Sequence, residues 1–489
     1  MTKLNFEQKI INVILLSGLT LSLDQFIYNR SLWIDEAALA LNIINKKGLE
    51  LLKPLDYMQV APVLFLQLEK LFSILLPNSE YGLRLLPLLC FWFSLYFFYE
   101  ILKLTFKNYY TIIFALSLFV FHYNLIYYSS EVKQYICDVL VLTSVYYFTL
   151  KNYKKEETKY YILGAFGCVS IYLSNVAPII LFSCGIYLFY NSLINKKTYF
   201  KHMAIVSFVW GITFLSYYYY FIHGHPIRDY MVTYWSNRNA FMPHDPFSID
   251  FYRFLVDKFK ILFDSPNSIM DKFLLPVLYF IGFITLIIRR KAGVLLMMLI
   301  PILLHFLLST FKLYPFDLRL ILHTVPIVII ITSFGFEYLI DNFFTNLRIE
   351  RFRLLAILIP LSLFFILYSA GFPQTHEEIK RSIIYIQNNL NKNDKIYVYY
   401  GASKAFKYYN DIQFMKISVP IINGGAHRNN NEEYINELRN LKGRIWLLFS
   451  HVHRNEEAYV VKNLDSLGYK KIKTFKTEGS SAYFYYFSE

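Results

Sequence analysis

The stretch "INVILLSGLTLSLDQFIYNRSLWIDEAALALN", residues 11–42, joins an apolar run to two adjacent carboxylates, Asp35 and Glu36. A run of about 17 to 25 apolar residues is long enough to cross a membrane as a helix. No small-residue cleavage site follows the run, so we expect a retained first span over 8–28 and not a cleaved signal peptide. The two carboxylates therefore emerge at the membrane surface directly after the first crossing.

The rest of the chain is also typical of a polytopic membrane protein. Its 489 residues are 56% hydrophobic and 19% aromatic, and polar residues form short clusters between long apolar runs. The net charge of +14 lies mainly where apolar runs end, which indicates orientation of spans and no nucleic-acid partner. The spacing of the four cysteines predicts neither disulfides nor a zinc site. The predicted spans are 8–28, 83–104, 109–128, 134–151, 159–174, 177–194, 202–222, 272–289, 293–310, 318–340 and 353–371, eleven in all.

One apolar run, 62–76, is too short to cross comfortably and carries Gln67, Glu69 and Lys70 at its middle. We expect it to be an interfacial amphipathic helix. With this run outside the membrane, the Lys- and Arg-rich connections all fall on one side, which predicts a cytoplasmic N-terminus and an extracytoplasmic C-terminus in the cell membrane. Those connections are 103–108, 151–159, 195–201, 289–291 and 346–353. The outer face then receives 29–82, 127–135, 223–271, 311–317 and everything after 372.

The composition changes abruptly after residue 372. Beta-type runs at 395–400, 444–450 and 480–487 alternate with helical patterns at 432–441 and 456–468, as in a small α/β domain. The predicted fold is therefore mainly α. It comprises a polytopic helical bundle over 1–372 with outer-face interfacial helices in the loop 29–82, a second large outer loop at 223–271, and an extracytoplasmic α/β domain over 373–489.

Ionisable side chains gather at the predicted outer ends of the spans. Charges at membrane depth cost several kcal/mol unless they are paired or hydrated, so such groups are functional candidates. Carboxylates mixed with cations suit transfer from a phospholipid whose leaving group is a phosphate. The cations would stabilise the departing phosphate, and a carboxylate would take the proton of an attacking hydroxyl. We predict Asp35 as that base, with Glu36 orienting it, a nearby cation or the acceptor. The candidates are Asp35, Glu36, Arg84, Glu131, Lys133, Asp317 and Arg319.

Structural explanations stay open for these residues. Asp35 and Glu36 are also typical of the acidic first turn of a surface helix. Arg84 is also typical of a side chain that extends to the membrane surface. Lys133 with Glu131 can pair with neighbouring spans, and Arg319 can pair with Asp317.

The ordered series of these segments resembles a known family. It comprises the Asp-Glu pair after the first span, "APVLFLQLEKLF" (61–72), "SEYGLRLLPLL" (79–89) and a span ending "YYSSEVKQY" (127–135). The series is similar to that of GT-C glycosyltransferases of the protein O-mannosyltransferase and aminoarabinose transferase type, over most of residues 1–340. The resemblance implies a membrane enzyme whose donor is a polyprenyl-phosphate-linked sugar. It also implies an active site on the outer face, between the first loop and the bundle.

The resemblance also carries over residue by residue. Asp35 matches the family's catalytic carboxylate, and Glu36 stands beside it. The turn from Ser130 to Tyr135 matches a family turn, with Lys133 where the family usually has arginine; this change keeps the charge but loses the two-pronged guanidinium. Arg319, followed by Pro326, matches an arginine before a late proline-containing span.

The sequence therefore predicts an inverting hexosyl- or pentosyltransferase. Lys133, Arg319 and Arg84 would hold the donor phosphate, with Glu131, Tyr135 and Asp317 in support. The partners would be the lipid-linked donor, a lipid, glycan or protein acceptor, and membrane lipids. Fixed cations on a good leaving group make a metal unnecessary, although a divalent metal stays open as a cofactor. The alternatives are a transporter or lipid-linked sugar flippase, and a membrane scaffold whose outer domain binds a partner.

Overall fold

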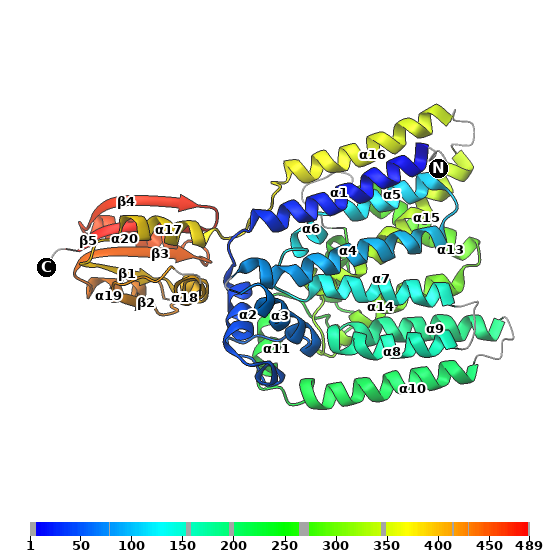
Figure 1. Ribbon diagram of the computed structural model, residues 1–489, viewed down its shortest axis with the longest axis horizontal. Coiled ribbons are helices and arrows are strands. Elements are labelled where there is room, and N and C mark those ends of the chain that lie inside the picture. The colour runs from blue at the N-terminus through cyan, green and yellow to red at the C-terminus, as the bar shows by residue number, and fades with distance from the viewer. Residues whose placement is uncertain are drawn as a thin grey trace.

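The computed structural model describes residues 6–77, 79–152, 158–194, 200–263, 273–343, 349–412, 415–428 and 430–487. These residues form a long helical bundle with a small sheet-containing domain at one end (Figure 1). Three of the basic connections used to predict orientation lie wholly or partly outside the described residues, at 153–157, 195–199 and 344–348. The last part of the predicted outer loop, 264–271, also lies outside them.

Each of the eleven predicted spans contains a helix, although 109–128 is divided into α5 and α6 at Phe121 and His122, and 318–340 begins with the 3-10 helix η4. Among the described residues, seven helices are long and apolar enough to cross a membrane, and α5, α8 and α13 are shorter apolar helices. The chain is thus a multi-pass membrane protein. The helices in these segments are α1 (Phe6–Tyr28), α4 (Glu80–Thr105), α5 (Tyr109–Val120), α6 (Tyr123–Tyr128), α7 (Tyr135–Asn152), α8 (Thr158–Leu173), α9 (Ala177–Ile194), α10 (Phe200–Tyr217) with η2 (Tyr218–Ile222), α13 (Leu275–Ile288), α14 (Ala292–Thr310), η4 (Leu318–Thr324), α15 (Val325–Phe343) and α16 (Ile349–Ser369).

Glycine lets two of these helices touch through their backbones. A Cβ added to Gly282 of α13 would lie 1.8 Å from the carbonyl oxygen of Ile331, and one added to Gly335 of α15 would lie 2.0 Å from that of Leu278. Small residues at such crossings are the usual device for helix packing in membranes, where lipid already solvates apolar side chains. A substitution at either glycine would therefore force these two helices apart.

The segments predicted for the outer face gather at one end of the bundle. They include α2 (Ile34–Asn45), η1 (Gly48–Leu52), α3 (Val63–Leu75), α11 (Arg228–Ser236) and α12 (Ile249–Ile261). Helix α3 is the run predicted as interfacial, and it packs against α4, α2 and α8. Figure 1 shows α2, α3 and α11 next to the C-terminal domain, with the N-terminus at the opposite end of the bundle.

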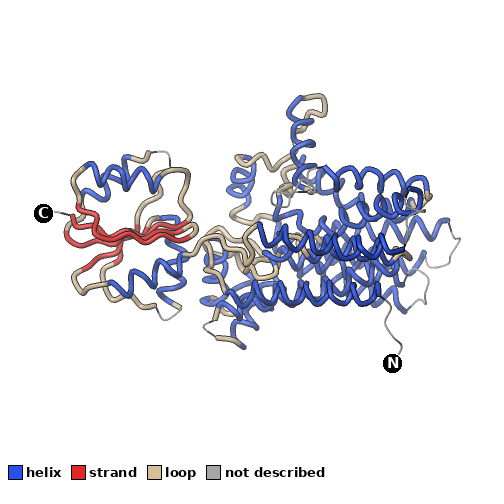
Figure 2. The backbone as a smooth tube through the Cα atoms, turned by 90° about the horizontal axis from the view of Figure 1, so that it is seen from above, coloured by secondary structure: helices blue, strands red, loops and turns tan. Residues whose placement is uncertain are grey.

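The C-terminal domain is a three-layer α/β unit. Its sheet has the order β2-β1-β3-β5-β4; β1, β2 and β3 are parallel, and β5 pairs antiparallel with β3 and β4. Helices α17 and α18 contact each other, as do α19 and α20, and Figure 2 shows helices on both faces of the sheet. The elements are α17 (Ile379–Asn389), β1 (Asp394–Val398), η5 (Tyr400–Ala402), α18 (Ser403–Asp411), β2 (Ile421–Asn423), α19 (Glu432–Arg439), β3 (Gly443–Ser450), α20 (Glu456–Ser466), β4 (Lys470–Thr477) and β5 (Ser480–Phe487).

Alternating side chains of the central strands make two separate cores. Ile396 of β1 and Trp446 of β3 join the core that includes α17 and α18. Tyr397 and Ile445, their chain neighbours, join the core that includes α19 and α20. This period of two is what strands buried on both faces require.

The three predicted strands form, and two further strands were missed. Strand β4 reads "KKIKTFKT" and lies at one edge of the sheet, where lysine side chains prevent pairing with another chain. Its pattern is therefore too polar to resemble a buried strand. Strand β2, at the other edge, has only three residues.

Polar contacts join the C-terminal domain to the start of the first outer loop. Gln25 and Gln374 exchange two hydrogen bonds of 2.7 Å, in which the Gln25 side chain accepts from the backbone N–H of Gln374 and donates to its carbonyl. The Tyr409 hydroxyl of α18 accepts from the N–H of Leu32 at 2.8 Å and donates to Glu80. These contacts place the domain directly over the beginning of α2.

Candidate active site

Helix α2 begins with the two predicted carboxylates in its first turn. Successive residues of a helix point about 100° apart, so the side chains enter different surroundings. Glu36 is fully buried, whereas the side chain of Asp35 keeps 29% of its surface exposed. Of the pair, Asp35 is therefore the carboxylate that a substrate can reach.

Glu36 lies in a buried ionic network. Its carboxylate accepts from Arg30 Nη1 at 2.6 Å, from Arg84 Nη2 at 3.4 Å and from the N–H of Val132 at 2.9 Å. Arg30 also lies 4.5 Å from the ring centre of Tyr127. The network ties α2, α4 and the turn 129–134 together. Glu36 thus contacts two arginines, while its predicted roles in the reaction stay predictions.

Arg84 lies in this same network. Its guanidinium donates to the carbonyl of Arg30 at 2.7 Å and to Asn29 at 3.0 Å, and it is buried. Its two terminal nitrogens are thus engaged by the protein, whereas its buried Nε makes no hydrogen bond to the residues that the structure describes. The contacts indicate that Arg84 holds the loop and Glu36, while its predicted contact with a donor phosphate stays a prediction.

Asp35 forms an ion pair with Arg319, which is 284 residues away in sequence. Arg319 Nη1 donates to Asp35 Oδ2 at 2.9 Å. The pair that the sequence offered, between Arg319 and Asp317, is not the one formed, because Asp317 instead lies 3.8 Å from the ammonium of Lys258. Arg319 is thereby directed into the centre of the site.

Three aromatic rings surround the Arg319 guanidinium. The ring centres of Trp33, Tyr135 and Trp235 lie 5.8, 5.9 and 5.4 Å from its central carbon. Cation–π contacts at this range hold a guanidinium in place without neutralising its charge. Arg319 is therefore a fixed cation beside the exposed carboxylate. Tyr135 lies near this cation, and its supporting role stays a prediction.

Lys133 is the second cation near Asp35. Its buried ammonium donates to Gln59 Oε1 at 2.6 Å. Burial and the charge of Arg319 lower the pKa of Lys133, against the opposing effect of Asp35. Burial acts to raise the pKa of Asp35, but the charges of Lys133 and Arg319, the hydrogen bond from Arg319 and the charge of His451 bring that pKa below its usual value. Asp35 is therefore ionised at neutral pH.

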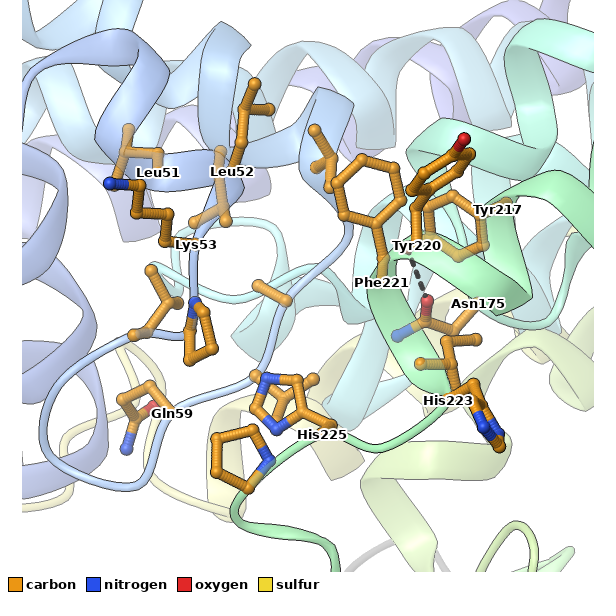
Figure 3. A pocket seen from close by; sticks show the side chains of 18 of the residues that line it. Leu51, Leu52, Lys53, Gln59, Asn175, Tyr217, Tyr220, Phe221, His223 and His225 are labelled. Carbon is orange, nitrogen blue, oxygen red and sulfur yellow. Dashed lines mark hydrogen bonds between the residues drawn. The ribbon is translucent and has the colours of Figure 1, made fainter.

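Gln59 connects Lys133 to a cavity of about 180 Å³. The cavity lies between the 51–66 segment and the end of α10, and its lining mixes aliphatic groups with His223, His225, Asn175 and Tyr217. Figure 3 shows Gln59 at one side and, across the cavity, the hydrogen bond between Tyr217 and Asn175, which measures 3.0 Å. Gln59 thus lies between this cavity and the buried ammonium of Lys133.

Glu131 is the remaining predicted acid, and it accepts a hydrogen bond from the indole N–H of Trp33 at 3.4 Å. Burial and the charge of Glu36 raise its pKa to about 7, from an ordinary 4.5. The folded state therefore binds a proton that the unfolded state releases between these values, so this group makes stability fall as pH rises through that window.

Glu131→Gln should remove this pH-dependent cost, because the amide keeps an acceptor for Trp33. We expect the variant to unfold at a higher temperature than the wild type above pH 7 and at the same temperature near pH 4.5. Thermal unfolding in detergent across this pH range measures the difference. Glu432→Gln, at an exposed carboxyl, should change neither temperature, and a lower unfolding temperature for Glu131→Gln at pH 8 would contradict the assignment.

Sequence reasoning missed Arg30, Gln59, Trp235, Glu377 and His451. Arg30 immediately precedes the quoted "SLWIDE" motif, so its position next to the two carboxylates could have identified it as a candidate. The others reach the site from distant segments and carry no local pattern. Within the described ranges, no group of three or more His, Cys, Asp or Glu side chains is arranged to hold a metal.

No family model and no curated protein matches the chain. The apo structure of ArnT from Cupriavidus metallidurans is similar over 97% of this chain and 97% of that chain, with a TM-score of 0.53 at 12% sequence identity. The fold is that of ArnT. A second ArnT structure from the same organism, bound to undecaprenyl phosphate, gives a TM-score of 0.51 at 11% identity, again over 97% of each chain. The ArnT likeness therefore includes both the bundle and the C-terminal domain, and it confirms the predicted GT-C type of fold.

Proposed function

We propose that the chain is an integral-membrane glycosyltransferase that moves a sugar from a polyprenyl-phosphate donor to an acceptor hydroxyl at the outer face. The observation that carries the proposal is the exposed carboxylate of Asp35, 2.9 Å from the fixed guanidinium of Arg319 and close to the buried ammonium of Lys133. The family resemblance of the sequence and the ArnT fold support it, and one ArnT structure is bound to undecaprenyl phosphate.

The two cations suit the leaving group. When the donor binds, its phosphate would compete with Asp35 for Arg319 and approach Lys133 from the opening of the site. Negative charge grows on this phosphate as the bond to the anomeric carbon breaks, so cations already in place favour the transition state. Because two cations supply this stabilisation, the proposed reaction needs no metal.

Asp35 is placed to act as the base for the acceptor hydroxyl in the proposed reaction. In an inverting transfer the acceptor oxygen attacks the anomeric carbon from the side opposite the phosphate. Asp35, released from Arg319 by the arriving phosphate, would take the proton from that oxygen. The hydroxyl can belong to a lipid, a glycan or a protein.

The cavity beside Gln59 suits the lipid part of the donor. It has aliphatic lining residues and borders the Lys133–Gln59 hydrogen bond. We propose that the first isoprene units lie there while the phosphate contacts Lys133. The chain would be oriented with its N-terminus in the cytoplasm, because its basic connections then face inward.

The candidate charges lie at one end of the bundle, next to α2 and the C-terminal domain. A transporter or flippase would instead require binding groups near the middle of the membrane. The arrangement therefore favours bond formation at the surface.

The proposed function is tested by release of free polyprenyl phosphate. Membranes containing the full-length protein would be incubated with a panel of labelled polyprenyl-phosphate sugars and cell-envelope extract as the source of acceptor. We expect release from one donor, together with transfer of its label to the extract. Absence of both products with every donor, from folded protein, would refute the function.

The phosphate-binding assignment makes a separate prediction. Lys133→Gln and Arg319→Gln should each raise the KM for the donor at least tenfold, because truncating one partner of a charged contact typically costs about 2–5 kcal/mol. Lys312→Gln, at an exposed lysine in a turn on the same end of the bundle, is the matched control. Initial rates at varied donor concentration measure the effect, and unchanged donor KM in both site variants would exclude these residues as phosphate ligands.

A further inference from the structure

The sheet of the C-terminal domain has its topological switch point between β1 and β3. From β1 the chain passes through α18 to β2 on one side, and from β2 it returns through α19 to β3 on the other side of β1. In parallel sheets the carboxyl ends of the strands at such a point form the usual ligand-binding crevice. His451 is the first residue after β3, and its ring centre lies 6.0 Å from that of Trp33. This crevice therefore faces the candidate active site.

The backbone at the end of β3 holds His451 in an uncommon conformation. Its φ of 51° lies in the left-handed region, which is costly for most residues and is found often at functional sites. The loop after β1 lies directly against it: a Cβ added to Gly401 would be 2.7 Å from the carbonyl oxygens of Ser450 and His451. Two loops thus fix the place from which the imidazole projects.

A buried carboxylate orients the imidazole. His451 Nδ1 lies 2.7 Å from Oε1 of Glu377, which is buried in the linker between α16 and α17. A carboxylate accepts at this contact, so Nδ1 carries the hydrogen, and the neutral ring keeps a lone pair on Nε2. Nε2 makes no hydrogen bond to any residue that the structure describes, and the His451 side chain is 34% exposed. The ring is therefore open to a proton donor.

His451 and Arg319, the ion-pair partner of Asp35, both lie near the Trp33 indole, at 6.0 and 5.8 Å from its ring centre. Trp33 precedes Asp35 by two residues, and His451 is near enough to Asp35 for its charge to act on that carboxylate when the ring is protonated. The neighbouring ionisable groups come from the linker, the membrane bundle and the loop after β3. They are Glu377, His376, Asp35, Lys133, Arg319, His453 and Arg454.

The pKa of Asp35 lies below its ordinary value, so a proton taken from the acceptor would leave Asp35 readily. The imidazole of His451, with its Nδ1 held by Glu377 at 2.7 Å and its side chain 34% exposed, can take that proton on. Resting on the function proposed above, we propose that His451, oriented by Glu377, is the proton-relay residue of the transfer reaction. The C-terminal domain thereby completes the active site.

The step balances as follows. The acceptor oxygen forms a bond to the anomeric carbon, and the electrons of the breaking carbon–oxygen bond go to the departing phosphate. The acceptor proton moves to Asp35 and then, by way of solvent water, to Nε2 of His451. The imidazolium is stabilised by Glu377 and later gives its proton to bulk water, which restores the starting state.

The test uses full-length protein with His451→Gly, because glycine accepts the left-handed backbone and leaves room for an imidazole molecule. Release of polyprenyl phosphate is measured with and without added imidazole and across pH. We expect kcat to fall about 10²-fold with donor KM unchanged, and imidazole to restore much of the rate. The pH–rate profile should differ between the two proteins, because only the wild type has the imidazole.

Glu377→Gln should lower kcat in the same direction, and His453→Gln, two residues along the same loop, should match the wild type. Wild-type kcat in His451→Gly would overturn the inference, as would a loss that imidazole does not restore and that leaves the pH profile unchanged. Each of these results requires a wild-type protein that transfers sugar. A wild type that transfers no sugar from any donor would instead refute the proposed function itself.

Discussion

Asp35→Asn should abolish sugar transfer while the protein stays folded. The asparagine is the same size as aspartate, and its side-chain oxygen can still accept the hydrogen bond from Arg319, which measures 2.9 Å in the wild type. It has no basic oxygen to take the acceptor proton, and general-base catalysis typically contributes about 10²–10⁴-fold. We therefore expect kcat for release of polyprenyl phosphate to fall by at least 10²-fold.

The matched control is Asp56→Asn. Asp56 lies in the same outer loop and pairs with Lys46 at 3.1 Å, with its carboxylate largely exposed. Its replacement should leave the rate unchanged, since exposed ion pairs contribute little. Binding of polyprenyl phosphate, the product, should persist in Asp35→Asn because Lys133 and Arg319 remain. A fully active Asp35→Asn variant would remove Asp35 from the mechanism.

The helical bundle was predictable because each membrane span appears in the sequence as one continuous apolar run. A run of apolar residues must be helical in lipid, whatever its neighbours, since every backbone group needs an internal partner. The run 62–76 was separable from the spans for the same reason, because Glu69 and Lys70 interrupt it. By contrast, β4 was missed because a solvated edge strand such as "KKIKTFKT" needs no apolar face.

The structure brings together charged residues that the sequence selected as candidates, but the sequence did not predict which of them would pair. Charges at span ends are expensive, which singled out Asp35, Glu131, Lys133 and Arg319 from sequence. Which charge meets which is decided by packing between distant helices, so the near neighbour Asp317 was a poor guide to the partner of Arg319. His451 reaches the site only because the C-terminal domain packs on α2 through helix α18, and that arrangement has no local signature.

The second large effect that we expect is a loss of stability when Glu36, the neighbour of Asp35, is replaced. Glu36→Gln should destabilise the protein strongly, because Glu36 lies between the buried guanidinium groups of Arg30 and Arg84. Removing one charge from a buried ion pair typically costs about 3–5 kcal/mol, since the partner is left uncompensated. We expect a correspondingly large fall in thermal stability in detergent.

Glu433→Gln, at an exposed glutamate of the C-terminal domain, should leave the unfolding temperature unchanged, and Asp35→Asn should change it little. The two neighbours would then have opposite phenotypes: loss of activity with the fold retained at Asp35, and loss of stability at Glu36. The physical reason is that neighbouring side chains of a helix point about 100° apart. The carboxylate of Asp35 is therefore partly exposed, whereas that of Glu36 is buried between two arginines. A Glu36→Gln protein as stable as the wild type but inactive would instead assign Glu36 to the chemistry, alongside Asp35.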